Sequence, residues 1–145
     1  MTKRIALVGG GRMGSAMLRG WAQTMPQLDL TLFEPVPNPD LAELVGAHGW
    51  KLNPDIRAGE KMDVVIIGVK PQSFAIACEQ TLLAITGPDT LVISIMAGFS
   101  TARIGADTGA QRVIRAMPNT PGQIGLGITA YVLGQGATDE DEAFA

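Results

Sequence analysis

Short apolar runs alternate with segments of helical periodicity along the whole chain. Residues 5–8 form a continuous apolar run closed by glycine, as expected for a strand buried on both faces of a parallel sheet. Apolar residues then recur at helical spacing over 13–25, and Pro26 ends that segment. Because alternating strand and helix signals are typical of βαβ units, the pattern predicts an α/β domain with a doubly wound, mainly parallel sheet.

The same periodicities predict the other elements. The later strands are expected over residues 28–33, 50–52, 63–69, 90–95, 112–117 and 128–133, the last of them at an edge of the sheet. The later helices are expected over residues 40–45, 71–85 and 100–104. Gly46 should end the first of these helices, Pro71 should lie in the first turn of the second, and Ser100 should cap the third. Cys78 falls in an apolar helical stretch and is expected to be a small buried core residue.

The end of the chain carries a helix-start signal. Thr138 is a capping residue, and the four acids at 139–142 would face the positive end of a helix dipole. One turn of helix is not stable alone, so we expect a helix that is cut short here; a frayed acidic tail is the alternative. The predicted division is a domain over 1–134, followed over 135–145 by the acidic start of a truncated helix.

Composition and charge limit the classes of protein that the chain can represent. Its 145 residues amount to about one domain, and 46% hydrophobic residues suit a compact core. The net charge of −3 argues against a nucleic-acid or acidic membrane surface. A single cysteine rules out an internal disulfide, and no metal site is predicted. With no signal peptide and no apolar run of about 20 residues, we expect a cytoplasmic protein.

A glycine-rich loop joins the first predicted strand to the first helix. Gly9, Gly11 and Gly14 match the pattern G-x-G-x-x-G in the strand–loop–helix context that it requires. The first glycine permits the turn, the second lets the backbone approach a pyrophosphate, and the third lets the helix pack on the sheet. N–H groups at the helix start then bind the phosphates. In this Rossmann-type fold, NAD(H) or NADP(H) is expected to contact Gly9, Gly10, Gly11, Arg12, Met13 and Gly14, although Arg12 could equally be a solvated surface residue.

Glu34 is the candidate for contact with the adenosine ribose. It ends the second strand about twenty residues beyond the loop, where an acid would accept a hydrogen bond from the 2′-hydroxyl and repel a 2′-phosphate. That position favours NADH. Alternatively, Glu34 is a solvated turn residue and Asn38 donates to a phosphate, although no Arg or Lys occupies the turn. Acceptance of both nucleotides is therefore expected.

Two later motifs are more specific than the glycine loop. Val69-Lys70-Pro71-Gln72 follows the fourth strand, and residues 115–121 at the end of the sixth read Arg-Ala-Met-Pro-Asn-Thr-Pro. With the loop at 9–14 and Ser-Ile-Met-Ala-Gly at 94–98, they resemble pyrroline-5-carboxylate reductase, the last enzyme of proline biosynthesis, over nearly the whole chain. The resemblance implies transfer of a hydride from NADH or NADPH to the C=N carbon of 1-pyrroline-5-carboxylate, which gives L-proline.

The resemblance also implies contacts with the nicotinamide half of the cofactor. Val69, Lys70 and Pro71 would line the nicotinamide ribose, and Ala97 and Gly98 would close against the ring. These residues follow predicted strand ends, where ligands bind in open α/β sheets. On position alone, Lys70-Pro71 could equally be a simple turn that opens a helix.

Further residues are implied at the two ends of the cofactor. Met117, Pro118, Asn119 and Thr120 would shape the floor of the pocket where cofactor meets substrate, and Asn53 would match a family asparagine near the adenosine. Asn119 and Thr120 are the candidates that line the substrate side. On position alone, they could equally form a capped turn.

Members of that family continue into a helical domain that forms the dimer and supplies most of the substrate site. That domain is missing here, so the resemblance implies a cofactor-binding half with little or no reductase activity alone. The substrate would bind only together with the missing domain, and full-length members are homo-oligomeric. One alternative is a stand-alone NAD(P)-binding module without catalysis. The other is a related reductase, such as a β-hydroxyacid dehydrogenase or a deazaflavin-dependent NADP reductase, which lacks the two later motifs.

Overall fold

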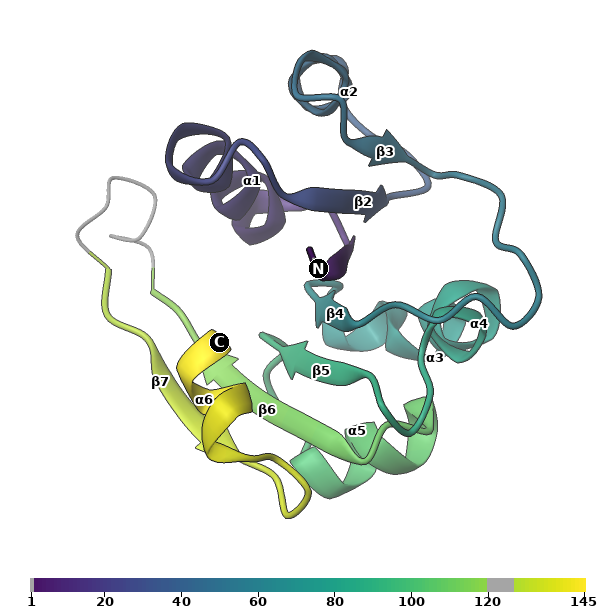
Figure 1. The fold of residues 1–145 in the computed structure, drawn as a ribbon, viewed down its shortest axis with the longest axis vertical. Coiled ribbons are helices and arrows are strands. Elements are labelled where there is room, and N and C mark those ends of the chain that lie inside the picture. The colour runs from purple at the N-terminus through teal and green to yellow at the C-terminus, as the bar shows by residue number, and fades with distance from the viewer. Residues whose placement is uncertain (1, 120–126) are drawn as a thin grey trace.

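A computed structural model describes residues 2–119 and 127–145, which form a seven-stranded sheet in the order β3-β2-β1-β4-β5-β6-β7 (Figure 1). The strands are β1 (Arg4–Val8), β2 (Asp29–Phe33), β3 (Lys51–Leu52), β4 (Val64–Ile67), β5 (Leu91–Ser94), β6 (Arg112–Met117) and β7 (Ala130–Leu133). All neighbouring strands are parallel except β6 and β7. The predicted Rossmann-like, mainly parallel sheet is confirmed, with the last strand at an edge.

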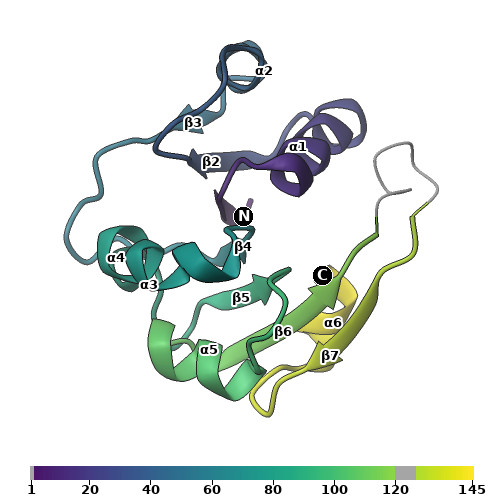
Figure 2. The ribbon, with the colours of Figure 1, turned by 180° about the vertical axis from the view of Figure 1, so that it is seen from behind.

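Helices cover both faces of this sheet. They are α1 (Arg12–Thr24), α2 (Pro39–Ala47), α3 (Phe74–Ala77), α4 (Leu83–Ile85), α5 (Thr101–Thr108) and α6 (Asp139–Phe144), with a 3₁₀ turn η1 (Pro71–Ser73) and a π turn η2 (Cys78–Leu82). Figures 1 and 2 show α1 and α6 on one side of the sheet and α3, α4 and α5 on the other. The sheet is therefore the middle of three layers.

The continuous apolar run of β1 serves two hydrophobic cores. Ile5 and Leu7 pack into a core that also contains Leu18 of α1. Ala6 and Val8 point to the other face, into a core with Phe74 of α3. Successive side chains of a strand alternate between faces, so a strand covered by helices on both sides must be apolar throughout. This is why β1 shows no polar alternation.

The structure differs from the prediction at the end of α2 and within the helical segment 71–85. Helix α2 runs through Gly46 to Ala47, so the prediction that Gly46 ends it was wrong. Gly49 adopts a positive φ of 66° just beyond the helix, and it is this left-handed residue that lets the chain turn. The segment 71–85 is helical as predicted, but residues 78–82 form a π turn.

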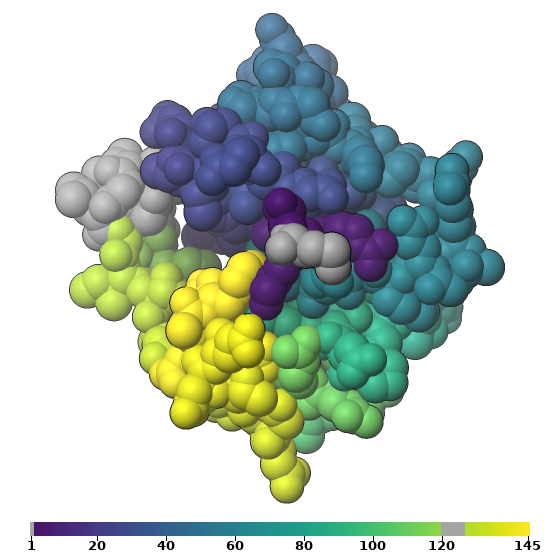
Figure 3. All heavy atoms as spheres, in the orientation of Figure 1, coloured from purple at the N-terminus to yellow at the C-terminus, as the bar shows by residue number. Residues whose placement is uncertain are grey.

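The helix predicted at the end of the chain is present and packs on the sheet. Thr138 and Asp141 form a capping box, and the Asp141 side chain is 1% exposed. Arg112 Nη1 of β6 donates to Asp141 Oδ1 at 2.7 Å, which ties α6 to the sheet. In Figure 3 the yellow C-terminal segment lies beside the purple N-terminal residues, where Lys3 Nζ is 4.5 Å from the centre of the Phe144 ring. The division of the chain at residue 134 stays a prediction.

Cys78 is buried in η2, as predicted. Burial, with smaller contributions from the Asp107 and Glu79 carboxylates, raises the pKa of its thiol from 9.0 to about 11. The folded protein therefore favours the neutral thiol, and the stability from this group is complete below pH 9.0 and lost as the pH rises through about 11.

At about pH 8 we expect the native thiol of Cys78 to react with a disulfide reagent far more slowly than the urea-unfolded thiol, because less of it is ionised in the folded protein. Equal rates in the native and unfolded protein would contradict this expectation.

Neither a membrane-spanning helix nor a metal cluster occurs in the part of the chain that the structure describes. Within residues 2–119 and 127–145, no helix combines the length and the apolar character needed to cross a bilayer. The same residues hold no group of three or more His, Cys, Asp or Glu side chains placed to bind a metal ion.

Candidate functional site

The strand order reverses direction between β1 and β4. Strands β2 and β3 are added in turn on one side of β1. The chain then crosses back, and β4 pairs with the other side of β1. The loops that leave the carboxyl ends of β1 and β4 therefore diverge to opposite faces of the sheet and open a crevice, which is where open α/β sheets bind ligands. Gly9 and Gly68 are the first residues of these two loops.

The three glycines of the predicted pattern have different surroundings. Gly9 has a φ of 105°, and a Cβ there would lie 2.7 Å from the Gly68 carbonyl carbon. A Cβ on Gly14 would lie 2.3 Å from the Gly9 carbonyl oxygen. Gly11 has an ordinary φ of −69°, and a Cβ there would meet nothing within 4 Å. The fold thus requires glycine at 9 and 14, whereas position 11 faces open space.

The start of α1 leaves its first amides available to a ligand. Its N-cap, Gly11, has no side chain that could bind the N–H groups of the first turn, and the first helical hydrogen bond runs from Ser15 N–H to Gly11 O at 2.8 Å. Ser15 Oγ donates to Gly10 O at 2.9 Å, which fixes the loop against the helix. Arg12 is exposed beside these amides. Such a helix start attracts anions through its unpaired N–H groups and the helix dipole.

A cavity of about 490 Å³ opens beside this loop at the carboxyl ends of β1, β2 and β4. Much of its lining was predicted from the sequence. The predicted residues that line it are Gly9, Gly11, Glu34, Asn53, Val69 and Lys70. The volume lies within the range of about 300–1,000 Å³ that is usual for small-molecule and cofactor sites.

Glu34 holds the glycine loop from the end of β2. Gly10 N–H donates to Glu34 Oε2 at 2.7 Å, and Val36 N–H donates to Oε1 at 3.2 Å. Asn53 in turn binds the Glu34 backbone twice, accepting from its N–H at 2.8 Å and donating to its carbonyl oxygen at 2.7 Å. Glu34 therefore has a structural role in holding the loop, and its contact with the ribose stays a prediction. Its negative charge is positioned at the mouth of the cavity with lone pairs still free.

The far wall of the cavity was not predicted. It is built by the helical segment after β4, through Ser73, Ile76, Ala77, Gln80 and Thr81. Ile76 is 57% exposed, and across the cavity Val36 is 84% exposed. A signal was present, because Ile76 is apolar yet lies off the buried helical stripe of Phe74, Cys78 and Leu82. An apolar side chain on the polar side of a helix can mark a binding surface.

The remaining predicted residues lie outside this cavity. Gly10, Met13 and Gly14 belong to the loop and helix start but do not line it, and Pro71 begins η1 directly after Lys70. Asn38 caps α2, its Oδ1 accepting from Leu41 N–H at 2.8 Å, so that oxygen has a structural role.

The predicted residues after β5 and β6 are likewise separate from the cavity lining. Ala97 and Gly98 follow β5 and are exposed, Met117 is 44% exposed, and Pro118 is half-buried. Asn119 Oδ1 accepts from Ile128 N–H at 2.9 Å, which joins the two ends of the connection between β6 and β7. Thr120 lies outside the described residues.

Comparison with known proteins relates the chain to nucleotide-dependent reductases. Residues 4–98 match the family described as "NADP oxidoreductase coenzyme F420-dependent". The chain is 36% identical to the pyrroline-5-carboxylate reductase of Vibrio alginolyticus, over 99% of this chain and 53% of that protein. It is 30% identical to the protein of that name from Escherichia coli, over 99% of this chain and 54% of that protein. The chain thus spans about half the length of these curated relatives.

Solved structures show the same relationship. A pyrroline-5-carboxylate reductase from Coxiella burnetii superimposes with a TM-score of 0.82 at 26% identity, covering 99% of this chain and 54% of that chain. The Plasmodium falciparum pyrroline carboxylate reductase, which was solved with NADP bound, has a TM-score of 0.75 at 19% identity, covering 98% of this chain and 52% of that chain. At that identity the second structure supports the fold alone.

Proposed function

This chain belongs to the family of coenzyme F420-dependent NADP oxidoreductases and is homologous to about half of pyrroline-5-carboxylate reductase, and we propose that it is the nucleotide-binding half of such a reductase. The observation that carries the proposal is the 490 Å³ cavity, in which the glycine loop, Glu34 and Lys70 meet at the point where the strand order reverses. The family match ends at residue 98, so it does not include the motif at 115–121. That motif falls within the alignments with the named reductases, which cover 99% of the chain.

In this proposal, NADH or NADPH extends along the carboxyl ends of the strands. The pyrophosphate binds the free amides at the start of α1, next to Gly11. The adenosine lies in the 490 Å³ cavity, where Glu34 accepts from the ribose and the exposed side chains of Val36 and Ile76 cover the base. The nicotinamide half extends past Val69 and Lys70 toward Ala97 and Gly98.

The proposed reaction is the reduction of 1-pyrroline-5-carboxylate to L-proline. The bound nicotinamide supplies a hydride to the C=N carbon. The role of this chain is to hold the reacting ring in place, because fixing two reactants in one geometry removes much of the entropic barrier to their reaction. Asn119 and Thr120 are proposed to line the substrate side of that position.

The second candidate is a stand-alone NAD(P)-binding module, and one observation favours it. The adenosine side has a cavity lined by this chain itself, whereas Ala97, Gly98 and Met117 on the nicotinamide side are exposed. For the 145-residue polypeptide we therefore propose nucleotide binding with little or no reductase activity by itself. Either a domain that follows in a longer chain or a separate polypeptide would complete the substrate site.

Calorimetric titration and an activity assay test the proposal together. We expect NADH or NADPH to bind the 145-residue chain in a one-to-one complex. With 1-pyrroline-5-carboxylate added, we expect proline only when the missing half of a homologous reductase is also supplied. Proline formed by this chain alone would contradict the assignment as an inactive half. Failure of both nucleotides to bind would contradict the proposed function itself.

Glu34→Gln is expected to shift the preference between the two nucleotides toward NADPH by about tenfold, because the repulsion between its carboxylate and a 2′-phosphate disappears. Glutamine can still accept from Gly10 N–H, so the loop keeps its anchor, which Glu34→Ala would remove. The measurement is the ratio of the two dissociation constants. Glu43→Gln, an exposed acid on α2, is the matched control and should leave that ratio unchanged. If Glu34→Gln and Glu43→Gln gave the same ratio of NADH to NADPH dissociation constants, Glu34 would have no part in the choice between the two nucleotides.

A further inference from the structure

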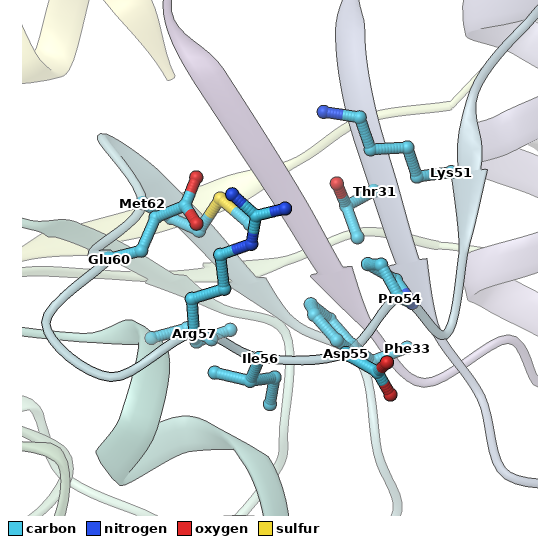
Figure 4. Close-up of a pocket in the computed structure, with 10 residues that line it drawn as sticks. Thr31, Phe33, Lys51, Pro54, Asp55, Ile56, Arg57, Glu60 and Met62 are labelled. Atoms are coloured by element: carbon cyan, nitrogen blue, oxygen red, sulfur yellow. The ribbon is translucent and has the colours of Figure 1, made fainter.

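A second cavity, of about 300 Å³, lies between the sheet and the segment that connects β3 to β4 (Figure 4). Residues 53–63 form this connection without a helix. On this face β2 and the edge strand β3 are covered by this irregular segment, which leaves space above Thr31 and Phe33. Phe33 also lines the 490 Å³ cavity, so its ring forms a shared wall between the two spaces.

Part of the lining of this second cavity is apolar. It consists of the side chains of Phe33, Pro54, Ile56, Met62 and Ile85. Phe33 is 7% exposed and Ile85 is 1% exposed, so these two are fixed parts of the core. Such a surface favours the apolar body of a ligand over a hydrated ion, because a hydrated ion would lose its water here without compensation.

Polar groups also line the cavity. Thr31 is only 2% exposed, and its side chain lines this space. In Figure 4 the Thr31 hydroxyl, the Lys51 ammonium and the Arg57 guanidinium lie on the same side, with the Glu60 carboxylate beside the guanidinium, and the Asp55 carboxylate is turned away from them. A hydroxyl that lines a cavity can donate a hydrogen bond to an acceptor bound there.

The lining carries two cations, Lys51 and Arg57, and two carboxylates, Asp55 and Glu60, and among the described residues Arg57 and Asp55 make no ion pair. Lys51 Nζ lies 3.8 Å from Asp29 Oδ1, and Glu60 Oε1 lies 3.5 Å from Arg4 Nη1. Arg57 makes no ion pair with any residue that the structure describes. Its guanidinium presents parallel N–H donors that match a carboxylate in two hydrogen bonds.

We propose that this second cavity is a binding site for a small organic carboxylate with a compact apolar body. The carboxylate pairs with Arg57 and accepts from the Thr31 hydroxyl, and the apolar body packs on Phe33 and Met62. The volume of about 300 Å³ suits a ligand of this size. The site is separate from the proposed nucleotide site, and it does not depend on the proposed function.

The test uses the ¹⁵N-labelled 145-residue chain and sodium benzoate as the probe, without any nucleotide. We expect amide shifts at residues 54–62 and at Thr31, with affinity of about millimolar, as is usual for so small a ligand. Benzamide has the same ring without the charge and should bind about tenfold more weakly, because it cannot form the charged pair with Arg57. Inorganic phosphate has the charge without the ring and should not displace benzoate.

Substitutions test which residues bind the carboxylate. Arg57→Gln should weaken benzoate binding by about tenfold, and Arg19→Gln, an exposed arginine on α1, should not change it. Thr31→Val keeps the shape of the buried side chain and should weaken binding several-fold. Arg57 is exposed, so its replacement leaves the fold intact, and the spectra of both arginine variants verify this.

Several results would overturn the proposal. Shifts confined to residues 9–14, or displacement of benzoate by NADH in direct competition, would place the probe in the 490 Å³ cavity. Equal affinities of Arg57→Gln and Arg19→Gln would remove Arg57 from the site. Displacement by phosphate would indicate a general anion site, and the absence of any shift would indicate no site. A chain that binds benzoate but no nucleotide would support this inference while contradicting the proposed function.

Discussion

Gly14→Ala is expected to lower the free energy of unfolding by about 3 kcal/mol, the upper part of the range for overpacked positions. The added Cβ would lie 2.3 Å from the Gly9 carbonyl oxygen. Gly9 has little room to retreat, because a Cβ added to it would lie only 2.7 Å from the backbone at Gly68 and Val69, in the loop after β4. Either α1 moves away from the sheet or the loop is distorted. Urea unfolding followed by tryptophan fluorescence measures the change.

Gly20→Ala is the matched control for that variant. It is the same substitution in the same helix, but a Cβ at position 20 would meet nothing within 4 Å. Alanine is the better helix former, so this variant should raise the unfolding free energy by about 0.5–1 kcal/mol. The two variants should therefore move in opposite directions. If Gly14→Ala were as stable as Gly20→Ala, the close approach of α1 to the loop would not be a constraint of this fold.

Gly11→Ala is expected to weaken NADH binding by about 100-fold, a loss of about 2.7 kcal/mol in binding, while lowering the unfolding free energy by only about 0.5–1 kcal/mol, because alanine is a poorer N-cap than glycine. The backbone at Gly11 suits alanine, with a φ of −69° and no atom within 4 Å of the position that the added methyl group would take. That methyl would occupy the space through which a pyrophosphate reaches the amides of α1. Calorimetric titration gives the affinity, and urea unfolding gives the stability.

The Gly20→Ala variant serves again as the control, because it should bind NADH as the unchanged protein does. If Gly11→Ala also kept full affinity, the pyrophosphate would not lie on this loop and the proposed site would be wrong. If it lost affinity and also as much stability as Gly14→Ala, position 11 would be a structural glycine like Gly9 and Gly14. Together the three variants separate the part of the motif that builds the fold from the part that meets the ligand.

The opposite wall of the nucleotide cavity depends on an irregular helix. Residues 71–85 pass from a 3₁₀ turn through a short α-helix into a π turn, and Gln80 and Thr81 of that π turn line the cavity. A π turn places an extra residue in the helix and is frequent at functional sites. The periodicity of the sequence indicated a helix here without indicating the extra residue, because Phe74, Cys78 and Leu82 still fall on one buried stripe.

Features set by local backbone preference could be predicted from the sequence. The strand–glycine loop–helix unit at 4–24 follows from a short apolar run, glycine conformations and helical spacing, all within one stretch of chain. The Ser100 cap is also local, since its Oγ accepts from Arg103 N–H three residues on. Alternation of such units predicted the parallel sheet, because a crossover helix returns the chain in the same direction each time.

Features set by contacts between distant residues were decided by the tertiary structure. Glu34 binds Gly10 across 24 positions of sequence, and Asn53 binds Glu34 across 19. The second cavity lies where the connection after β3 crosses the sheet without a helix, beside Thr31 and Phe33 of β2. The sequence alone determined where the main strands and helices form and where the glycine loop after β1 lies. The register of β1 against β2 and β4 decided which side chains meet at the carboxyl end of the sheet. Residues such as Gly10 and Glu34 are brought together by the packing of the strands, and their spacing along the chain does not reveal the contact.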